Sequence, residues 1–116
     1  MIKGRVIHGR GIGANLGYPT ANILPEEESR LESGVYAANV RIGHKRHRAV
    51  FVVGAIADVF PYSLEAHLLD FTGDLYGQAL VVEVFEKVSG LERFDSDKEL
   101  IVKIQADIAK AREILK

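Results

Sequence analysis

YAANVRIGHKRHRAVFVV, residues 36–53, contains two apolar runs separated by a polar and basic segment. In the first run every second residue is apolar, and this spacing places four residues on one face of a strand: Tyr36, Ala38, Val40 and Ile42. The second apolar run covers 49–53, and the segment 43–47 between the runs begins with a glycine. This arrangement predicts an antiparallel hairpin with a basic turn.

Alternation of the same kind continues on both sides of the hairpin. Leu80, Val82 and Val84 share one face of a further strand, and we expect two more strands over residues 3–8 and 64–71. Five or so short strands without intervening helices favour an antiparallel barrel, because closure removes the exposed sheet edges.

A helix is predicted at the end of the chain. Ser96 and Glu99 have the spacing of a capping box, in which the two side chains satisfy free amides of the first turn. Apolar residues then recur at three and four positions and form a stripe that should pack on the barrel: Ile101, Ile104, Ile108, Ala111 and Leu115.

Length and composition limit the class of protein. A chain of 116 residues with 47% apolar residues suffices for one core, so we expect a single domain over residues 1–116. No apolar run approaches the about 20 residues that cross a bilayer, and the absence of cysteine excludes disulfides and thiolate metal sites. We expect a cytoplasmic monomer without membrane partners. The net charge of -1 argues against a nucleic-acid partner.

HGRGIGANLG, residues 8–17, is rich in glycine and could approach phosphate closely through backbone N–H groups, with Gly9, Gly11 and Gly13 as candidate contacts. The segment is not a P-loop, because no Gly-Lys-Ser/Thr follows. It is not a dinucleotide-binding turn either, because Pro19 and a strand-like segment follow. A simple glycine-rich turn is the alternative.

Thr20 and Asn22 lie two residues apart, so an extended backbone places both side-chain oxygens on one side. Neutral hard oxygens suit Mg²⁺, which takes its remaining ligands from water and nucleotide phosphates. The alternative is a turn in which both side chains only bond the backbone.

Glu65 and His67 occur in EAHLLDF, residues 65–71, where alternation places them on the same face as Leu69 and Phe71. A carboxylate in such a setting can act as a general base, whereas the alternative is two polar groups that face solvent. The histidines do not show the spacing of a zinc site.

Two aromatic residues complete the set of candidates. Tyr76 occurs in the turn-like DLYG, residues 74–77, where it could pack on a neighbour. Phe94, just before the helix cap, could be a hydrophobic staple or offer its ring to an aromatic ligand.

Taken in order, several segments resemble the riboflavin kinase family across nearly the whole chain: HG with the glycine loop, LGYPTAN (16–22), GVY (34–36), EAHLLDF, DLYG and FDS (94–96). The LGxPTAN stretch is highly specific. The resemblance implies a six-stranded antiparallel Greek-key barrel with a C-terminal helix. It also implies that ATP and riboflavin meet over the barrel mouth, and that the product is FMN.

The resemblance also implies roles for individual residues. Thr20 and Asn22 correspond to Mg²⁺ ligands, with Thr20 also touching the nucleotide phosphates, and Glu65 corresponds to the base that accepts the proton of the riboflavin 5′-hydroxyl. The remaining positions are nucleotide contacts (Gly9, Leu68, Asp70 and Tyr76) or flavin contacts (Ser89, Glu92 and Phe94).

The chain departs from the family at a few positions. Ala14 replaces a usual basic residue, and Ser89 and Leu91 replace an Arg-x-Glu pair, so we expect no strong local restraint on the connection before the helix. Nothing in the chain resembles the adenylyltransferase domain of many bacterial relatives, and we expect no FAD synthesis. These losses keep open a non-catalytic module that binds flavin or nucleotide, and less favourably a barrel that binds protein or RNA.

Overall fold

The computed structural model describes residues 1–8, 17–27, 31–54, 63–92 and 94–116. Gly9, Gly11, Gly13 and Ala14 lie outside these residues. The described elements are β1 (Ile2–Ile7), β2 (Ala21–Pro25), β3 (Gly34–Ile42), β4 (Lys45–Gly54), β5 (Ser63–Leu68), β6 (Ala79–Ser89) and α2 (Asp97–Ile114). The helix in this part of the chain is not apolar enough to cross a membrane.

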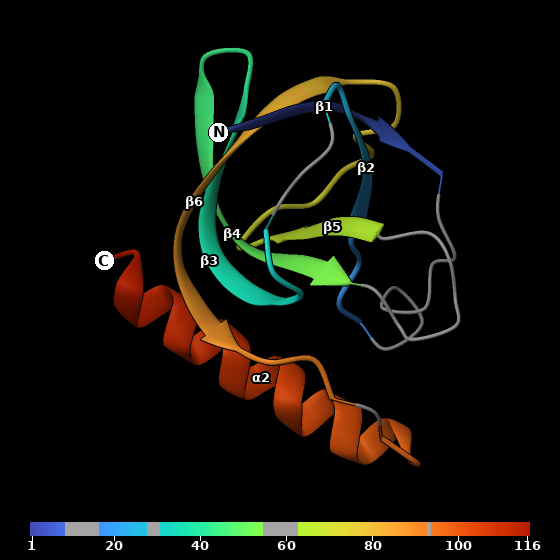
Figure 1. The fold of residues 1–116 in the computed structure, drawn as a ribbon, viewed down its shortest axis with the longest axis vertical. Coiled ribbons are helices and arrows are strands. Elements are labelled where there is room, and N and C mark those ends of the chain that lie inside the picture. Colours follow the sequence, from blue (N-terminus) through green and yellow to red (C-terminus); the bar gives the residue numbers. More distant parts are fainter. Residues whose placement is uncertain (9–16, 28–30, 55–62, 93) are drawn as a thin grey trace.

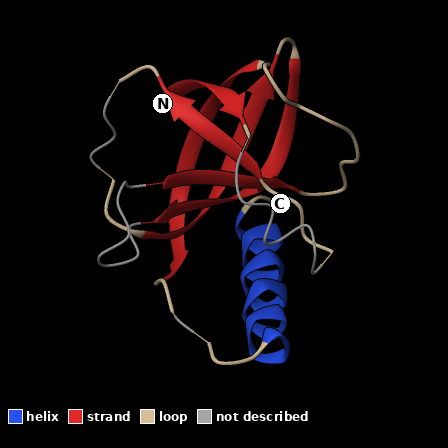
Figure 2. Ribbon diagram, turned by 90° about the vertical axis from the view of Figure 1, so that its right-hand side faces the viewer, coloured by secondary structure: helices blue, strands red, loops and turns tan. Residues whose placement is uncertain are grey.

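The strands form a closed antiparallel barrel in the order β1-β2-β5-β4-β3-β6 (Figures 1 and 2). Strands β3, β4 and β5 are consecutive neighbours, and β6 returns to lie beside β3, which is the Greek-key connection. The predicted six-stranded Greek-key barrel with a C-terminal helix is therefore confirmed.

The hairpin of β3 and β4 has the register that the sequence pattern requires. Its strands pair from Gly34 with Val53 to Ile42 with Lys45, so the connecting loop is shorter than the predicted basic segment. Gly43 has φ +61°, a conformation that a two-residue hairpin loop needs and that glycine adopts without a steric penalty. The alternating residues of β3, β4 and β6 face the barrel interior, where Phe51 and Val82 are fully buried.

The opposite face of β3 is also buried, because α2 packs against it. Val35 and Ala37 of β3 form a second cluster with Val50, Val88 and Ala111. In Figure 1 the helix runs diagonally below the barrel, across the outer side of the strands. The Ser96 side chain accepts a hydrogen bond from the Glu99 backbone N–H at 3.2 Å, which confirms the predicted N-terminus of the helix.

Strand β5 is shorter than predicted, and this changes the position of one side chain. The strand ends at Leu68, and Asp70 has φ +57° in the turn after it. Leu69 packs in the cluster under the helix, whereas Phe71 contacts the cluster inside the barrel. The prediction that Phe71 shares the face of Glu65 is wrong, because the turn at Asp70 breaks the alternation.

Candidate active site at the barrel mouth

Strands β2 and β5 bring the candidate metal ligands to the candidate base. Asn22 pairs with Glu65 in the antiparallel register, so both side chains lie on the same side of the sheet. Ile23 and Ala66, their neighbours along each strand, point into the barrel core, which places Asn22 and Glu65 on the outer face. Thr20 donates a hydrogen bond from Oγ1 to Glu65 Oε1 at 3.1 Å.

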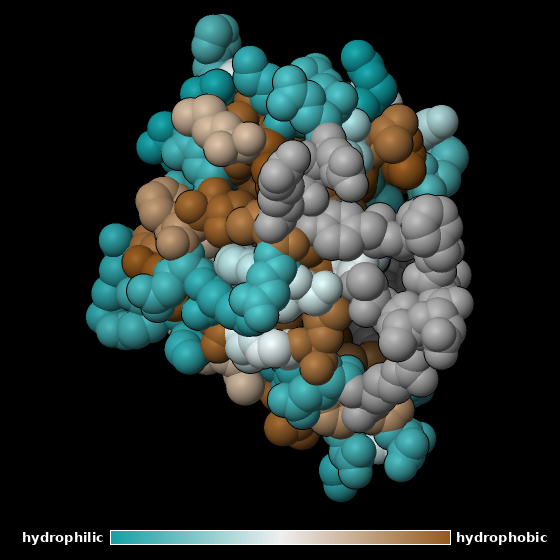
Figure 3. All heavy atoms as spheres, in the orientation of Figure 1, coloured by the Kyte–Doolittle hydropathy of each residue, from teal (hydrophilic) through white to brown (hydrophobic). Residues whose placement is uncertain are grey.

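A cavity of about 360 Å³ is lined by Thr20 and Asn22 but not by Glu65. It is lined by the end of β1, the start of β2 and the segment after β5, and it brings together four of the predicted site residues: Thr20, Asn22, Leu68 and Tyr76. In Figure 3 apolar residues gather near the middle of this face, and hydrophilic ones lie along its upper, left and lower edges. The lining of the cavity combines apolar side chains with the oxygen-bearing side chains of Thr20 and Asn22.

Tyr76 stands at the edge of this cavity on a well-defined turn. Its backbone N–H donates to Asp74 Oδ1 at 2.9 Å, and Gly77 comes next with φ +80°. The ring of Tyr76 is 49% exposed and stacks on His8 with centroids 3.7 Å apart. The sequence did not point to His8 as its partner, because nearly seventy positions separate the two residues in the chain.

The oxygen atoms here have the chemistry that Mg²⁺ prefers. The Thr20 hydroxyl donates its hydrogen bond to Glu65, so its lone pairs remain free for a cation, and Asn22 adds a neutral carbonyl oxygen. Among the described residues, no group of three or more His, Cys, Asp or Glu side chains could hold a metal. A site of this kind suits a cation that arrives with phosphate and water ligands.

Two predicted ligand contacts have protein partners instead. Asp70 forms a bidentate pair with Arg112 of α2, at 2.8 and 2.9 Å, and also bonds Arg48. The hydrogen bond from Arg112 is the main cause that lowers the pKa of Asp70 from its usual value of 3.8. Since Asp70 is not among the residues that line the cavity, the structure does not bring it to the other nucleotide residues.

Ser89 likewise faces the helix. It is the last residue of β6, and its hydroxyl donates to Asp107 Oδ1 and accepts from Lys103 Nζ, both at 2.8 Å. The expectation that the connection lacks a local restraint is therefore wrong at Ser89. Glu92 is exposed and Phe94 is partly buried, and their assignment to flavin stays a prediction.

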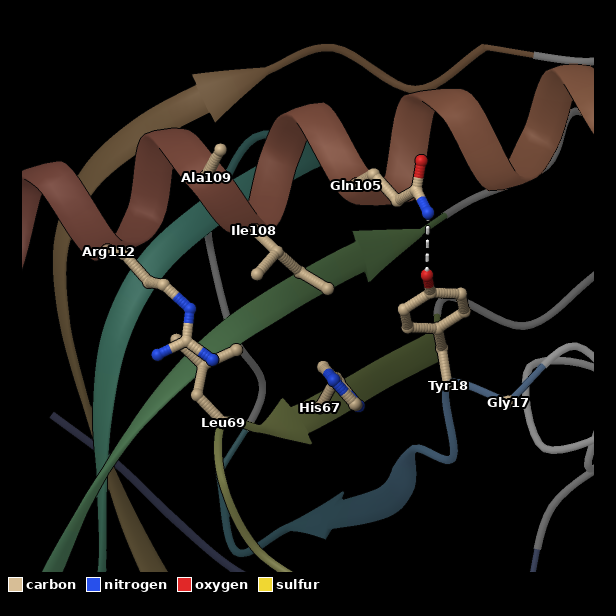
Figure 4. A pocket seen from close by; sticks show the side chains of 8 residues that line it. All are labelled: Gly17, Tyr18, His67, Leu69, Gln105, Ile108, Ala109 and Arg112. Atoms are coloured by element: carbon tan, nitrogen blue, oxygen red, sulfur yellow. Dashed lines mark hydrogen bonds between the residues drawn. The ribbon is translucent and has the colours of Figure 1, made fainter.

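A second cavity of about 380 Å³ lies between α2 and the segment that leads into β2. Its lining includes Tyr18 and His67 on one side and Gln105 and Arg112 on the other (Figure 4). Sequence reasoning considered His67 only as a solvent-facing group or a neighbour of the base. Local patterns could not reveal these contacts, because the cavity joins segments far apart in the sequence.

The fold and this mouth define a small closed-barrel domain with a partly apolar cavity beside a group of neutral side-chain oxygens. Residues 1–115 match the family model for flavokinase, that is, riboflavin kinase. The chain therefore belongs to the riboflavin kinase family, whose members use ATP as co-substrate.

Curated relatives agree with this membership. Bifunctional riboflavin kinase/FMN adenylyltransferases from Pseudomonas fluorescens and Escherichia coli K12 are each 38% identical over 97% of the chain, and the chain spans 37% of their length. An RNA-binding riboflavin kinase from Bacillus subtilis is 32% identical over 94% of the chain, which spans 48% of that protein.

Solved structures share the fold. A structure titled macrolide-efflux protein, from Streptococcus pneumoniae, has a TM-score of 0.88 and 31% identity over 96% of the chain and 38% of its own. Riboflavin kinase from Trypanosoma brucei has a TM-score of 0.69 over 98% of the chain and 78% of its own, and at 21% identity it supports the barrel fold alone.

Proposed function

We propose that this domain transfers the γ-phosphoryl group of Mg-ATP to the 5′-hydroxyl of riboflavin and forms FMN and ADP. The observation that carries the proposal is the contact of Thr20 with Glu65, with Asn22 opposite Glu65 in the paired strands. One base on β5 and two neutral oxygens at and just before the start of β2 are the groups that phosphoryl transfer needs, since this reaction depends on alignment and charge neutralisation.

In this proposal Glu65 is the general base. Its Oε1 is held by Thr20, which fixes the orientation of the carboxylate, and its other oxygen can accept the proton of the riboflavin hydroxyl. The hydroxyl oxygen forms the new bond to the γ-phosphorus while the bond to the bridging oxygen breaks and ADP leaves. Thr20 and Asn22 would hold Mg²⁺, which neutralises charge on the phosphates when it is bound.

The cavity at the barrel mouth suits the nucleotide. The cavity with Leu68 and the His8–Tyr76 stack offers apolar and aromatic surface for the nucleotide, and the glycine loop, Gly9 included, would supply phosphate contacts. Ser89 and Asp70 contact α2, and their assignments to flavin and nucleotide stay predictions. The net charge of -1 supports small-molecule partners over nucleic acid.

Glu65→Gln tests the proposal, because the amide keeps the shape of the side chain and cannot accept the proton. We expect FMN formation, measured by chromatography with riboflavin, ATP and Mg²⁺, to fall by about 10² to 10⁴ while the riboflavin KM stays nearly unchanged. Glu86→Gln, an exposed glutamate on β6, is the matched control and should keep parental turnover.

Three results would contradict parts of this proposal. Parental turnover in Glu65→Gln would assign Glu65 a structural role. Tight flavin or nucleotide binding without any FMN would identify a non-catalytic binding module. A parent protein that binds neither ligand would exclude both functions.

A further inference from the structure

The segment that carries Thr20 lies immediately before a barrel strand. β2 begins at Ala21, so residues 17–20 have no strand pairing to fix them. Pro19 lacks a backbone N–H, which leaves its carbonyl as its one backbone hydrogen-bonding group. A contact to that carbonyl therefore helps to set the position of Thr20.

His67 makes this contact. The distance from His67 Nδ1 to the carbonyl oxygen of Pro19 is 2.7 Å. Because a carbonyl only accepts hydrogen bonds, Nδ1 must carry the proton and donate it. A hydrogen bond of this kind fixes both the ring orientation and the peptide that precedes Thr20.

The same strand provides this contact and the base. His67 lies two residues after Glu65 in β5, so both side chains project from the outer face. The segment is thus tied to β5 twice, through the Thr20 hydroxyl to Glu65 and through the Pro19 carbonyl to His67. Two anchors on one rigid strand fix the distance between the base and the cation ligand.

The helix supports the arrangement from the other side. The ring of Tyr18 meets His67 edge to face, with centroids 5.9 Å apart and an angle of 71°. The Tyr18 hydroxyl accepts a hydrogen bond from Gln105 Nε2 of α2 at 3.2 Å (Figure 4). Figure 4 shows Tyr18 under Gln105 of the helix, with His67 beside it on the left.

We infer that His67 is a positioning residue for the cation and nucleotide half of the proposed reaction, acting through Pro19 on Thr20, with Tyr18 and Gln105 as its support. The inference rests on the proposed function for the identity of the reaction, but it makes a separate claim about Mg²⁺-dependent nucleotide binding. Groups that orient metal ligands typically contribute 10- to 100-fold in metal affinity or activity.

Four variants separate positioning from general stability. His67→Leu removes the donor, whereas His67→Asn keeps an N–H near the place of Nδ1 and should restore much of the function. His44→Leu, at the exposed hairpin turn, is the matched control. Thr20→Val removes the proposed cation ligand itself, and its loss of Mg-ADP binding is the reference for the loss in the His67 variants.

The measurements are Mg²⁺-dependent ADP binding by calorimetry, the KM values for ATP and riboflavin, and the melting temperature. We expect His67→Leu to weaken Mg-ADP binding about 10- to 100-fold, with riboflavin KM close to the parent. His67→Asn should recover most of this loss, and His44→Leu should match the parent.

Other results would overturn the inference. Mg-ADP binding in His67→Leu equal to the parent, or an equal change in both KM values that tracks the loss of melting temperature, would reduce His67 to a packing residue. A parent that binds no Mg-ADP would overturn the cation assignment and the inference together. A parent that binds Mg-ADP but forms no FMN would overturn the proposed function alone and leave the binding test valid.

Discussion

Lys103, Asp107 and Ser89 form a largely buried polar triad between α2 and the end of β6, and removing its cation alone should destabilise the fold strongly. Lys103 Nζ lies 2.7 Å from Asp107 Oδ2, and their side chains are only 14% and 11% exposed. Lys103→Met removes the cation and leaves the Asp107 carboxylate buried beside the Ser89 hydroxyl. This change isolates the cost of an unpaired buried charge.

Breaking a buried pair from one side costs about 3–5 kcal/mol. Because the two side chains retain slight exposure, we expect the lower end, about 3 kcal/mol, for Lys103→Met. With a urea m-value of about 1–3 kcal/mol/M, the unfolding midpoint should fall by about 1 to 3 M. Urea unfolding followed by circular dichroism measures this shift.

Two further variants test the reasoning. The triple variant Ser89→Ala, Lys103→Met and Asp107→Leu removes every polar member, and its stability should lie within about 1 kcal/mol of the parent. Lys116→Met breaks the exposed pair with Glu113 and should change stability by less than about 1 kcal/mol. If Lys103→Met is no worse than Lys116→Met, or the triple variant is as unstable as the single one, the triad is not a buried ionic network.

Two other predictions concern the pair at the helix end and the close packing of β1. The Arg112 hydrogen bond lowers the pKa of Asp70 below 3.8. The pair therefore stabilises the fold above pH 3.8, and this contribution disappears as the pH falls through the lower pKa of the folded state. In Arg112→Met, acid unfolding should shift to higher pH. A Cβ at Gly4 would lie 2.6 Å from the Leu24 carbonyl oxygen, so Gly4→Ala should cost about 1–3 kcal/mol in thermal unfolding, whereas Gly90→Ala, with open space, should cost far less.

Much of the barrel could be predicted because its strands alternate. Val40 and Val82 point inward as their spacing requires, and the Ser96 cap begins the helix as its sequence indicates. The prediction was wrong at Phe71, where a left-handed Asp70 ends the alternation after a strand shorter than expected. A single turn residue can reverse the face on which the next side chains lie, and local periodicity does not report it.

The candidate site could likewise be predicted only in part from the sequence. Thr20 and Asn22 share a side because they lie two residues apart, but their distance to Glu65 depends on strand pairing across more than forty positions. Asp70 and Ser89 were expected to contact ligand, and both have helix residues as partners. Sequence patterns identify groups with suitable chemistry, whereas only pairing and packing decide which groups meet.

Local patterns along the chain predicted the alternating strands, the capped helix and the set of oxygen-bearing residues, since each of these depends on neighbouring positions. Other features are seen only in the tertiary structure: the way the barrel closes, the contact of Thr20 with Glu65, the hydrogen bond from His67 to Pro19 and the polar triad under α2. These features join distant segments, and their free energy arises only when the chain has closed the loops between them.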